Sequence, residues 1–248
     1  LSSMPQETIV VMRDVTEARQ REAVRETFIG VLSHELRTPV TMIFGGAQIL
    51  ARETSNLDEA TKRSISRDIY IEAERLQRLV EDVLALNRFG DGPGEIGWEP
   101  VLLQRLVPRV VQSEETRWPS VTFVLDIATD LPTVTADQTY VEQVIRNLLT
   151  NAAKYGGPGS TVTLKAEAGD GEVLVRVLDD GPGFPADEAP RLFELFYRSP
   201  GTASSAGGAG IGLFVCARLI GAMDGRIWAT PRDQGGAEFG FALAELKE

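Results

Sequence analysis

The 248-residue chain contains a single histidine, His34, which lies in the run SHELRTP at residues 33–39. A neutral imidazole is a competent nucleophile near physiological pH. The carboxylate of Glu35 could hold one tautomer of the ring and accept its proton. Thr38 follows one helical turn later and would lie on the same side of a helix as His34. Taken alone, the run is equally compatible with a surface histidine that has no catalytic role.

The residues around His34 predict a solvent-facing histidine beside a helix bend. On a helical wheel of about 100° per residue, His34 falls roughly 60° outside the apolar face of its segment. Pro39 costs about 3 kcal/mol inside a helix, because it lacks an N–H and clashes with the carbonyl of Glu35. A helix that keeps such a residue is expected to bend there, next to the candidate nucleophile.

A pair of asparagines, Asn147 and Asn151, would share one face of a helix because they are four residues apart. An amide oxygen is a hard ligand that suits Mg²⁺, which usually keeps several waters and the substrate phosphates as its other ligands. Lys154 and Tyr155 follow, and the lysine could pair with phosphate. Asparagine is a poor residue for helix interiors, so the pair requires an explanation. Capping or surface asparagines are the alternative.

A carboxylate at the end of a predicted strand is a second candidate ligand-binding feature. Asp179 begins the run DDGPG at residues 179–183 and could accept a hydrogen bond from an exocyclic amine such as that of adenine. Gly181 and Gly183 would let a flat base approach the backbone closely. An ordinary Asp-Gly turn would have the same sequence.

Two further stretches complete the candidate nucleotide site. Phe193 and Phe196 precede Arg198, which leads into a glycine-rich loop at 199–210 and could swing onto a γ-phosphate. The aromatic residues alone more often indicate core packing. Glycines before a helix start expose N–H groups to anions, and the helix dipole adds to this attraction. The glycine-rich helix start includes Gly208, Gly210, Gly212 and Leu213.

Hydrophobic periodicity predicts a helical hairpin, with helices over 16–53 and 59–88. A short strand at 7–13 precedes it. One hairpin leaves much apolar surface open, and pairing two hairpins into a four-helix bundle would bury that surface. We therefore expect a homodimer. The glycine-rich stretch 90–97 predicts a linker.

Beyond the linker the pattern changes to that of a mixed α/β domain. The predicted helices are 101–117 (with Pro108 as a kink), 137–155 and 209–223, and the predicted strands are 121–127, 161–168, 172–179, 225–230 and 236–244.

Composition excludes several classes of function. The net charge of −11 argues against nucleic acid and anionic membrane as main partners, because both bind basic patches. The only cysteine, Cys216, excludes a disulfide framework and a thiolate metal cluster, and its apolar neighbours predict a buried residue. No apolar run approaches the ~20 residues that cross a bilayer, so we expect a cytoplasmic stretch, with an upstream membrane anchor left open.

The SHELRTP run, on the first helix of a hairpin, resembles the H-box of sensor histidine kinases of two-component systems, which have a HisKA-type dimerisation domain. The four stretches of the second domain resemble, in order and spacing, the N, G1, F and G2 boxes of the GHKL ATP-binding fold. Gly235 and Gly236 are similar to a looser final glycine box. Residues 14–17 resemble the end of a PAS sensor domain. Ile211 stands where the family more often has leucine, a conservative departure.

This resemblance implies roles for the candidate residues. His34 would be phosphorylated, Glu35 would assist proton removal, and Thr38 would orient a water against the phospho-aspartate of a partner. Asn151 would be the Mg²⁺ ligand and Asp179 would bind adenine.

The resemblance also implies that Gly208, Gly210 and Gly212 shape a phosphate loop and that residues from about 197 to 210 form an ATP lid.

The expected fold is multidomain: a helical hairpin that dimerises into a four-helix bundle, followed by a GHKL-type α/β sandwich in which a mixed sheet packs on helices. The expected domains are a sensor remnant and connector (1–16), a dimerisation and phosphotransfer hairpin (17–90), a linker (91–97) and a catalytic ATP-binding domain (98–248).

The expected function is that of a protein-histidine kinase core. With ATP and Mg²⁺ it would phosphorylate His34, pass the phosphoryl group to an aspartate of a response regulator receiver domain, and also act as a regulator phosphatase. An upstream sensor domain would control it. The alternatives are a phosphatase-biased protein, a catalytically silent dimeric scaffold, and an ATPase of the chaperone or topoisomerase kind, which the H-box disfavours. The input signal, the cognate regulator and cis or trans transfer stay open.

Overall fold

The computed structural model describes residues 16–52, 57–88, 96–201 and 210–246. The predicted strand at 7–13, the PAS-like residues 14–15 and most of the 199–210 loop lie outside these ranges. Contacts divide the chain into two compact units, Leu1–Leu76 and Gln77–Glu248.

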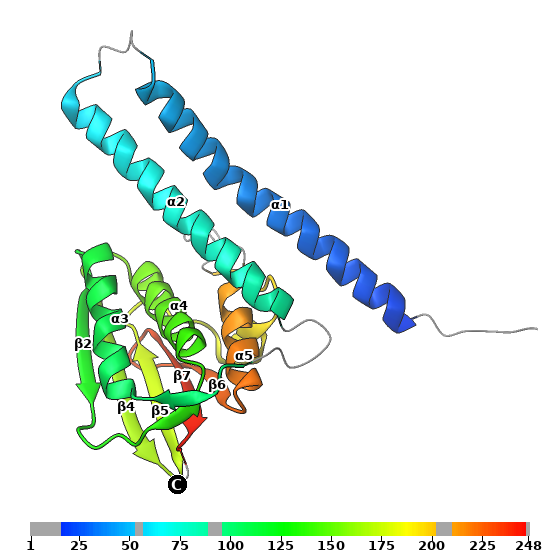
Figure 1. Ribbon diagram of the computed structural model, residues 1–248, viewed down its shortest axis with the longest axis vertical. Helices are drawn as coiled ribbons and strands as arrows, with labels where there is room; N and C mark the ends of the chain where they lie inside the picture. Colours follow the sequence, from blue (N-terminus) through cyan, green and yellow to red (C-terminus); the bar gives the residue numbers. More distant parts are fainter. Residues whose placement is uncertain (1–15, 53–56, 89–95, 202–209, 247–248) are drawn as a thin grey trace, which may run out of the picture. The chain divides into compact units, whose positions relative to one another are not determined.

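The first unit contains α1 (Thr16–Leu50) and the larger part of α2 (Glu59–Arg88), which form the predicted hairpin (Figure 1). The first helix ends three residues before the predicted position, whereas the second has the predicted bounds. Asp58 caps α2, because its carboxylate accepts a hydrogen bond from the N–H of Thr61 at 2.6 Å. Pro39 lies inside α1, and the helix continues through it.

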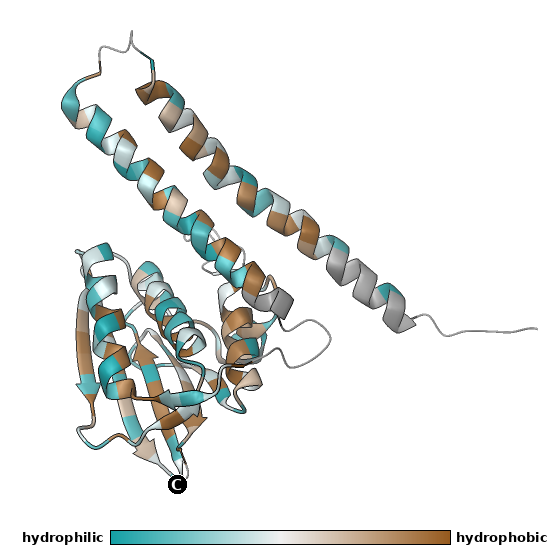
Figure 2. Cartoon of the chain, viewed as in Figure 1, coloured by the Kyte–Doolittle hydropathy of each residue, from teal (hydrophilic) through white to brown (hydrophobic). Residues whose placement is uncertain are grey.

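The two helices of the hairpin approach each other closely at Gly46. A Cβ at this position would lie 2.9 Å from Cγ1 of Ile69 and 3.3 Å from Cγ2 of Ile65, so a larger side chain would require these isoleucines to shift. Many apolar side chains nevertheless stay exposed in the single chain. Figure 2 shows that hydrophobic positions recur along both helices. Among the described side chains of the unit, the large apolar residues that are exposed are Ile29, Val40, Met42, Phe44, Ile49, Tyr70 and Ile71, with exposed fractions from 44% to 68%.

The second unit contains a five-stranded mixed sheet. Strand β2 is parallel to β4, and the other neighbouring pairs are antiparallel. The strand order is β2 (Thr122–Ile127), β4 (Thr161–Gly169), β5 (Glu172–Leu178), β7 (Ala237–Ala244) and β6 (Arg226–Pro231). The bounds of these strands agree with those of the five predicted strands to within one residue at each end.

Helices α3 (Leu103–Arg117), α4 (Gln138–Gly156) and α5 (Gly212–Ala222) cover one face of this sheet (Figure 1). Asp137 caps α4, since its side chain accepts hydrogen bonds from the N–H groups of Thr139 and Tyr140. The layer of helices on a mixed sheet is the expected α/β architecture.

Three elements of the second unit were not predicted from the sequence. Strands β1 (Glu99–Val101) and β3 (Val134–Ala136) form a separate antiparallel pair. A 3₁₀ helix, η1, spans Ala186–Phe193.

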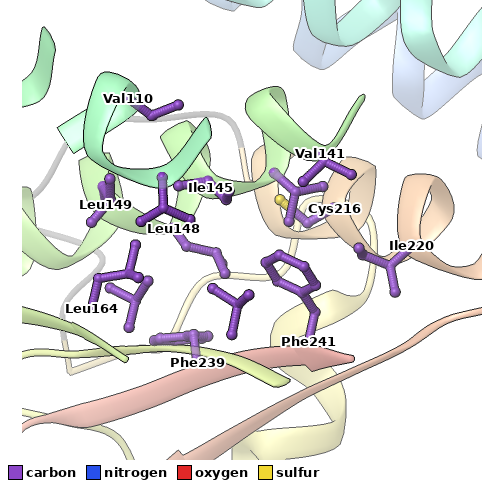
Figure 3. Close-up of a cluster of buried hydrophobic side chains, with 14 of the residues drawn as sticks. Val110, Val141, Ile145, Leu148, Leu149, Leu164, Cys216, Ile220, Phe239 and Phe241 are labelled. Atoms are coloured by element: carbon purple, nitrogen blue, oxygen red, sulfur yellow. The ribbon is translucent and has the colours of Figure 1, made fainter. Parts of the chain in front are cut away.

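The hydrophobic core lies between the helices and the sheet. Figure 3 shows Leu148 and Ile145 of α4 facing Leu164 and Phe241 of the sheet, and all four are fully buried. Cys216 is fully buried in this cluster, as predicted, and burial raises the pKa of its thiol. Among the described residues, no helix is both long enough and apolar enough to cross a membrane.

The C-terminal part of α2 belongs to the second unit and packs on it. Leu79 contacts the hydrophobic core, and Oδ1 of Asp82 accepts a hydrogen bond from Nε2 of Gln143 on α4 at 3.1 Å. Burial raises the pKa of Asp82 from 3.8 to about 6, and the hydrogen bond from Gln143 only partly offsets this effect. The ionised form of Asp82 is therefore destabilised in this packed position.

We predict that the packing of residues 77–84 on α4 depends on pH through Asp82. Folding raises the pKa of the Asp82 carboxyl group. The contribution of this group to the stability of the packing is therefore fully present below about pH 3.8, and it is lost as the pH rises through about 6. The loss should reach about 3 kcal/mol. Amide hydrogen exchange of residues 77–84, corrected for the intrinsic exchange rate, measures this loss between pH 4 and 7. Protection of these amides should fall with rising pH in the wild type and should not fall in Asp82→Asn. Glu81→Gln, at an exposed neighbouring position, should behave like the wild type; an unchanged dependence in Asp82→Asn would contradict the prediction.

Candidate active site

The candidate nucleophile lies on the surface of the first unit. The His34 side chain is 76% exposed, whereas that of Glu35 is 19% exposed. Nδ1 of His34 lies 3.9 Å from Oε1 of Glu35, so Nδ1 is the ring nitrogen that faces the carboxylate. The exposed hydroxyl of Thr38 donates to the carbonyl oxygen of His34 at 3.4 Å, a long hydrogen bond. The structure thus brings His34, Glu35 and Thr38 together, as the sequence predicted.

An arginine that sequence analysis did not identify also contacts this group. Nη2 of Arg75 on α2 donates to Oε2 of Glu35 at 3.0 Å. The two residues are 40 positions apart in the chain, so only the register of the hairpin brings them together.

Helix α4 carries the predicted N-box residues in the second unit. Asn147 and Asn151 are both half-buried, one turn apart. Nδ2 of Asn147 is buried and, within the described residues, has no hydrogen bond of good geometry, although the Asp82 carboxylate lies nearby. Nζ of Lys154 lies 5.2 Å from the centre of the Tyr155 ring. Burial raises the pKa of Tyr155, and the nearby positive charge of Arg198 acts in the opposite direction.

Asp179, just after β5, is 3% exposed and is held by backbone groups. Its Oδ1 accepts hydrogen bonds from the N–H of Gly181 at 2.9 Å and from that of Ala237 at 3.2 Å. Burial raises the pKa of Asp179, while these hydrogen bonds and the charge of Arg232 oppose the shift. Both backbone donors reach the same oxygen, and the carboxylate is therefore oriented before any ligand arrives.

Glycines are required around Asp179 because neighbouring backbone lies too close for a side chain. A Cβ on Gly236 would lie 2.0 Å from the carbonyl oxygen of Asp179, and one on Gly183 would lie 2.7 Å from that of Gly236. Both glycines also have positive φ values, 86° and 68°. A Cβ on Gly181 would lie 3.0 Å from the carbonyl oxygen of Tyr155, which places the G1-like turn against the C-terminal end of α4.

Arg232 is a second contact that sequence analysis missed. Its Nη1 donates to the carbonyl oxygen of Asp179. Arg232 lies between β6 and the Gly235–Gly236 pair. A basic residue close to that glycine pair was the feature of the sequence that could have indicated this contact.

The two ends of the predicted lid lie side by side. The N–H of Phe196 donates to the carbonyl oxygen of Gly210 at 2.9 Å. Gly210 has φ +68°, and a Cβ there would lie 2.8 Å from the carbonyl carbon of Phe196. Phe193 and Phe196 are half-buried against the hydrophobic core, the packing that aromatic residues most often indicate. Contact of either ring with a nucleotide stays a prediction.

The start of α5 lies against the N-box helix. A Cβ on Gly212 would lie 3.7 Å from Nδ2 of Asn147, so the first residue of α5 faces the first asparagine. Among the described residues, no side chain caps the start of α5, and uncapped N–H groups at a helix start can bind an anion. Leu213 is half-buried, and Gly208 lies outside the described residues. Helix α4 thus contacts both glycine-rich segments, through Tyr155 near its C-terminal end and Asn147 near its middle.

These residues fit a magnesium nucleotide. Asn151 is half-buried, and its amide oxygen is a ligand type that suits Mg²⁺ bound mainly through water and phosphates. The described residues contain no cluster of three or more His, Cys, Asp or Glu side chains that would bind a metal ion without a nucleotide.

Two protein families match the chain. The family described as "His Kinase A (phospho-acceptor) domain" matches residues 24–92. The family described as "Histidine kinase-, DNA gyrase B-, and HSP90-like ATPase" matches residues 136–247. The two matches together contain every candidate site residue.

Individual proteins agree with this assignment. The chain is 35% identical over 229 residues to the probable sensor histidine kinase TcrY of Mycobacterium tuberculosis, covering 91% of the chain and 47% of TcrY. Full-length ShkA in complex with AMPPNP has a TM-score of 0.64 at 30% identity, covering 90% of the chain and 47% of ShkA. Histidine kinase ThkA, solved in complex with response regulator protein TrrA, shares the fold, with a TM-score of 0.66 at 23% identity, covering 94% of the chain and 65% of the matched chain.

The chain spans 25% to 57% of the length of the curated relatives most similar to it. Those relatives are sensor proteins and sensor kinases, and both matched families occur in the expected order along the chain. The chain therefore belongs to the sensor histidine kinases of two-component systems.

Proposed function

We propose that the chain transfers the γ-phosphoryl group of ATP to His34 and then to an aspartate of a response regulator. The observation that carries this proposal is the exposed imidazole of His34, with Nδ1 facing a carboxylate at 3.9 Å, in a phospho-acceptor domain that is followed by an ATPase-like domain.

The adenine end of ATP would bind at Asp179. Its carboxylate is already oriented by two backbone N–H groups and can accept a hydrogen bond from the exocyclic amine. Gly181 and Gly183 would let a flat base approach the backbone of this turn closely. Phe193 and Phe196 would border the base, and the crystallised complex of ShkA with AMPPNP, an ATP analogue, supports a nucleotide in this fold.

The phosphates would lie between α4 and the start of α5. Asn147, Lys154 and Tyr155 would contact them from α4, and the N–H groups near Gly210, Gly212 and Leu213 would contact them from the glycine-rich side. Mg²⁺, held by the amide oxygen of Asn151, would neutralise phosphate charge. Arg198 and Gly208 would complete the lid side.

His34 would attack the γ-phosphorus through Nε2 while the proton on Nδ1 passes to Glu35. Catalysis would otherwise consist of positioning and charge neutralisation. The second domain would be joined to the hairpin through residues 91–97 so that it can reach His34.

The exposed apolar side chains of the hairpin favour a homodimer, since one chain leaves them uncovered. A response regulator receiver domain would dock near His34, as the complex of ThkA with TrrA supports. We further propose that this stretch works in the cytoplasm under control of an upstream sensor.

Labelling with γ-³²P-ATP and Mg²⁺ tests the kinase activity. We predict an acid-labile, base-stable label in the wild type and none in His34→Gln, since the chain has no other histidine. Nucleotide binding by His34→Gln should match the wild type because the site is built from other residues. Label that persists in His34→Gln would contradict the assignment of the nucleophile.

Substitution of Asp179 tests the adenine site. Asp179→Asn should weaken ATP binding roughly 10- to 100-fold, because the exocyclic amine loses a charged acceptor. Titration of each variant with a fluorescent ATP analogue, checked by calorimetry, measures this change. Asp180→Asn, at the exposed neighbouring position, is the matched control and should bind with wild-type affinity. Equal affinities for the two variants would refute the role of Asp179.

Thr38 tests the phosphatase activity. Thr38→Ala should abolish dephosphorylation of the response regulator while autophosphorylation stays within about twofold, because the hydroxyl would orient water and not the nucleotide. Thr41→Ala removes a similarly exposed hydroxyl on the same helix and serves as the control. Loss of both activities in Thr38→Ala would count against this assignment.

A further inference from the structure

Four charged or titratable side chains form a chain of contacts at the phosphotransfer site. Nδ1 of His34 faces Oε1 of Glu35 at 3.9 Å, and Oε2 of Glu35 accepts from Nη2 of Arg75 at 3.0 Å. Nη1 of Arg75 in turn lies 3.6 Å from Oε2 of Glu72, one turn earlier on α2. The described geometry thus links the nucleophile to a second helix through an ion-pair network.

The two carboxylate oxygens of Glu35 have different partners. Oε2 is occupied by a guanidinium, while Oε1 is the oxygen nearer the imidazole. A glutamate on a helix surface would otherwise populate several rotamers. Because Arg75 comes from the opposite helix, its contact selects a rotamer of Glu35 that presents Oε1 to His34.

Arg75 is itself oriented. Its side chain is 34% exposed, and those of Glu35 and Glu72 are 19% and 21% exposed, so the network is shielded more than an ordinary surface ion pair. A guanidinium presents its donors in a rigid plane, and two nitrogens can therefore contact two carboxylates at fixed angles.

We propose that Arg75 is a positioning residue for Glu35 and, through Glu35, for the proton transfer that accompanies phosphorylation of His34. This inference rests on the proposed function. In the step, Nε2 forms a bond to the γ-phosphorus, the bond from that phosphorus to the bridging β–γ oxygen breaks, and ADP leaves with the electron pair. The Nδ1 proton passes to Oε1 of Glu35. Arg75 keeps Oε1 on the side of the ring from which this transfer occurs.

A purely structural ion pair that joins α1 to α2 is the alternative. The single histidine provides a readout that separates the two, because imidazole ¹⁵N spectra of the untagged chain report on His34 alone. A positioned Glu35 favours the Nδ1–H tautomer. A structural cross-link would leave the tautomer ratio unchanged and would lower thermal stability.

The test compares Arg75→Ala, Arg75→Lys, Glu35→Gln and the double variant Arg75→Ala/Glu35→Gln in the full chain. Arg67→Ala removes an exposed arginine from the same helix and is the matched control. In the spectra, Arg75→Ala should shift the tautomer ratio toward that of Glu35→Gln, Arg75→Lys should restore it in part, and Arg67→Ala should leave it unchanged.

Autophosphorylation at saturating ATP gives the second readout. Arg75→Ala should lower kcat roughly 10- to 100-fold with KM for ATP unchanged, and it should cause no further loss in the Glu35→Gln background. An unshifted tautomer ratio, or losses that multiply in the double variant, would overturn the inference. Absence of label in the wild type would instead contradict the proposed function, while the spectra would still decide whether Arg75 positions Glu35.

Discussion

The proposed nucleotide site depends on the closure of backbone around Asp179. An ionised carboxylate that is 3% exposed is costly unless hydrogen bonds replace its water, and here the N–H groups of Gly181 and Ala237 do so. The same closure brings Gly236 so near the Asp179 carbonyl that a Cβ would lie 2.0 Å from it. The glycines are therefore required by packing alone, before any ligand is considered. A carboxylate oriented in this way loses little freedom when a base binds, which favours affinity.

Long elements with clear periodicity were predictable from the sequence. Helix α2 has the predicted bounds of Glu59–Arg88, because Asp58 is a strong capping residue and the apolar positions recur every three or four residues. Strands β1 and β3 have three residues each, too few to show alternation, and they form because they pair with each other. The 3₁₀ helix η1 contains Pro190, which masks any helical pattern.

The candidate site residues likewise differ in whether they have a local sequence pattern or depend on contacts with distant parts of the chain. Residues within short motifs, such as His34 and Asp179, were identified because their chemistry and spacing are local. Arg75 and Arg232 were missed, since they reach Glu35 and Asp179 from 40 and 53 positions away. Such contacts depend on the register of a hairpin or of two strands, which residue types alone do not specify.

The two candidate functional carboxylates, Asp179 and Glu35, differ in the kind of group that holds them. Asp179 is held by backbone N–H groups, which cannot move unless the sheet edge itself rearranges. Glu35 is held by the guanidinium at the end of the Arg75 side chain, and a small rotation or slide of α2 against α1 would change that contact. In the proposed mechanism, nucleotide binding therefore depends on a rigid element, whereas proton transfer at His34 depends on the packing of two helices. A signal that shifts one helix of the hairpin would alter the phosphotransfer step and leave the nucleotide site intact.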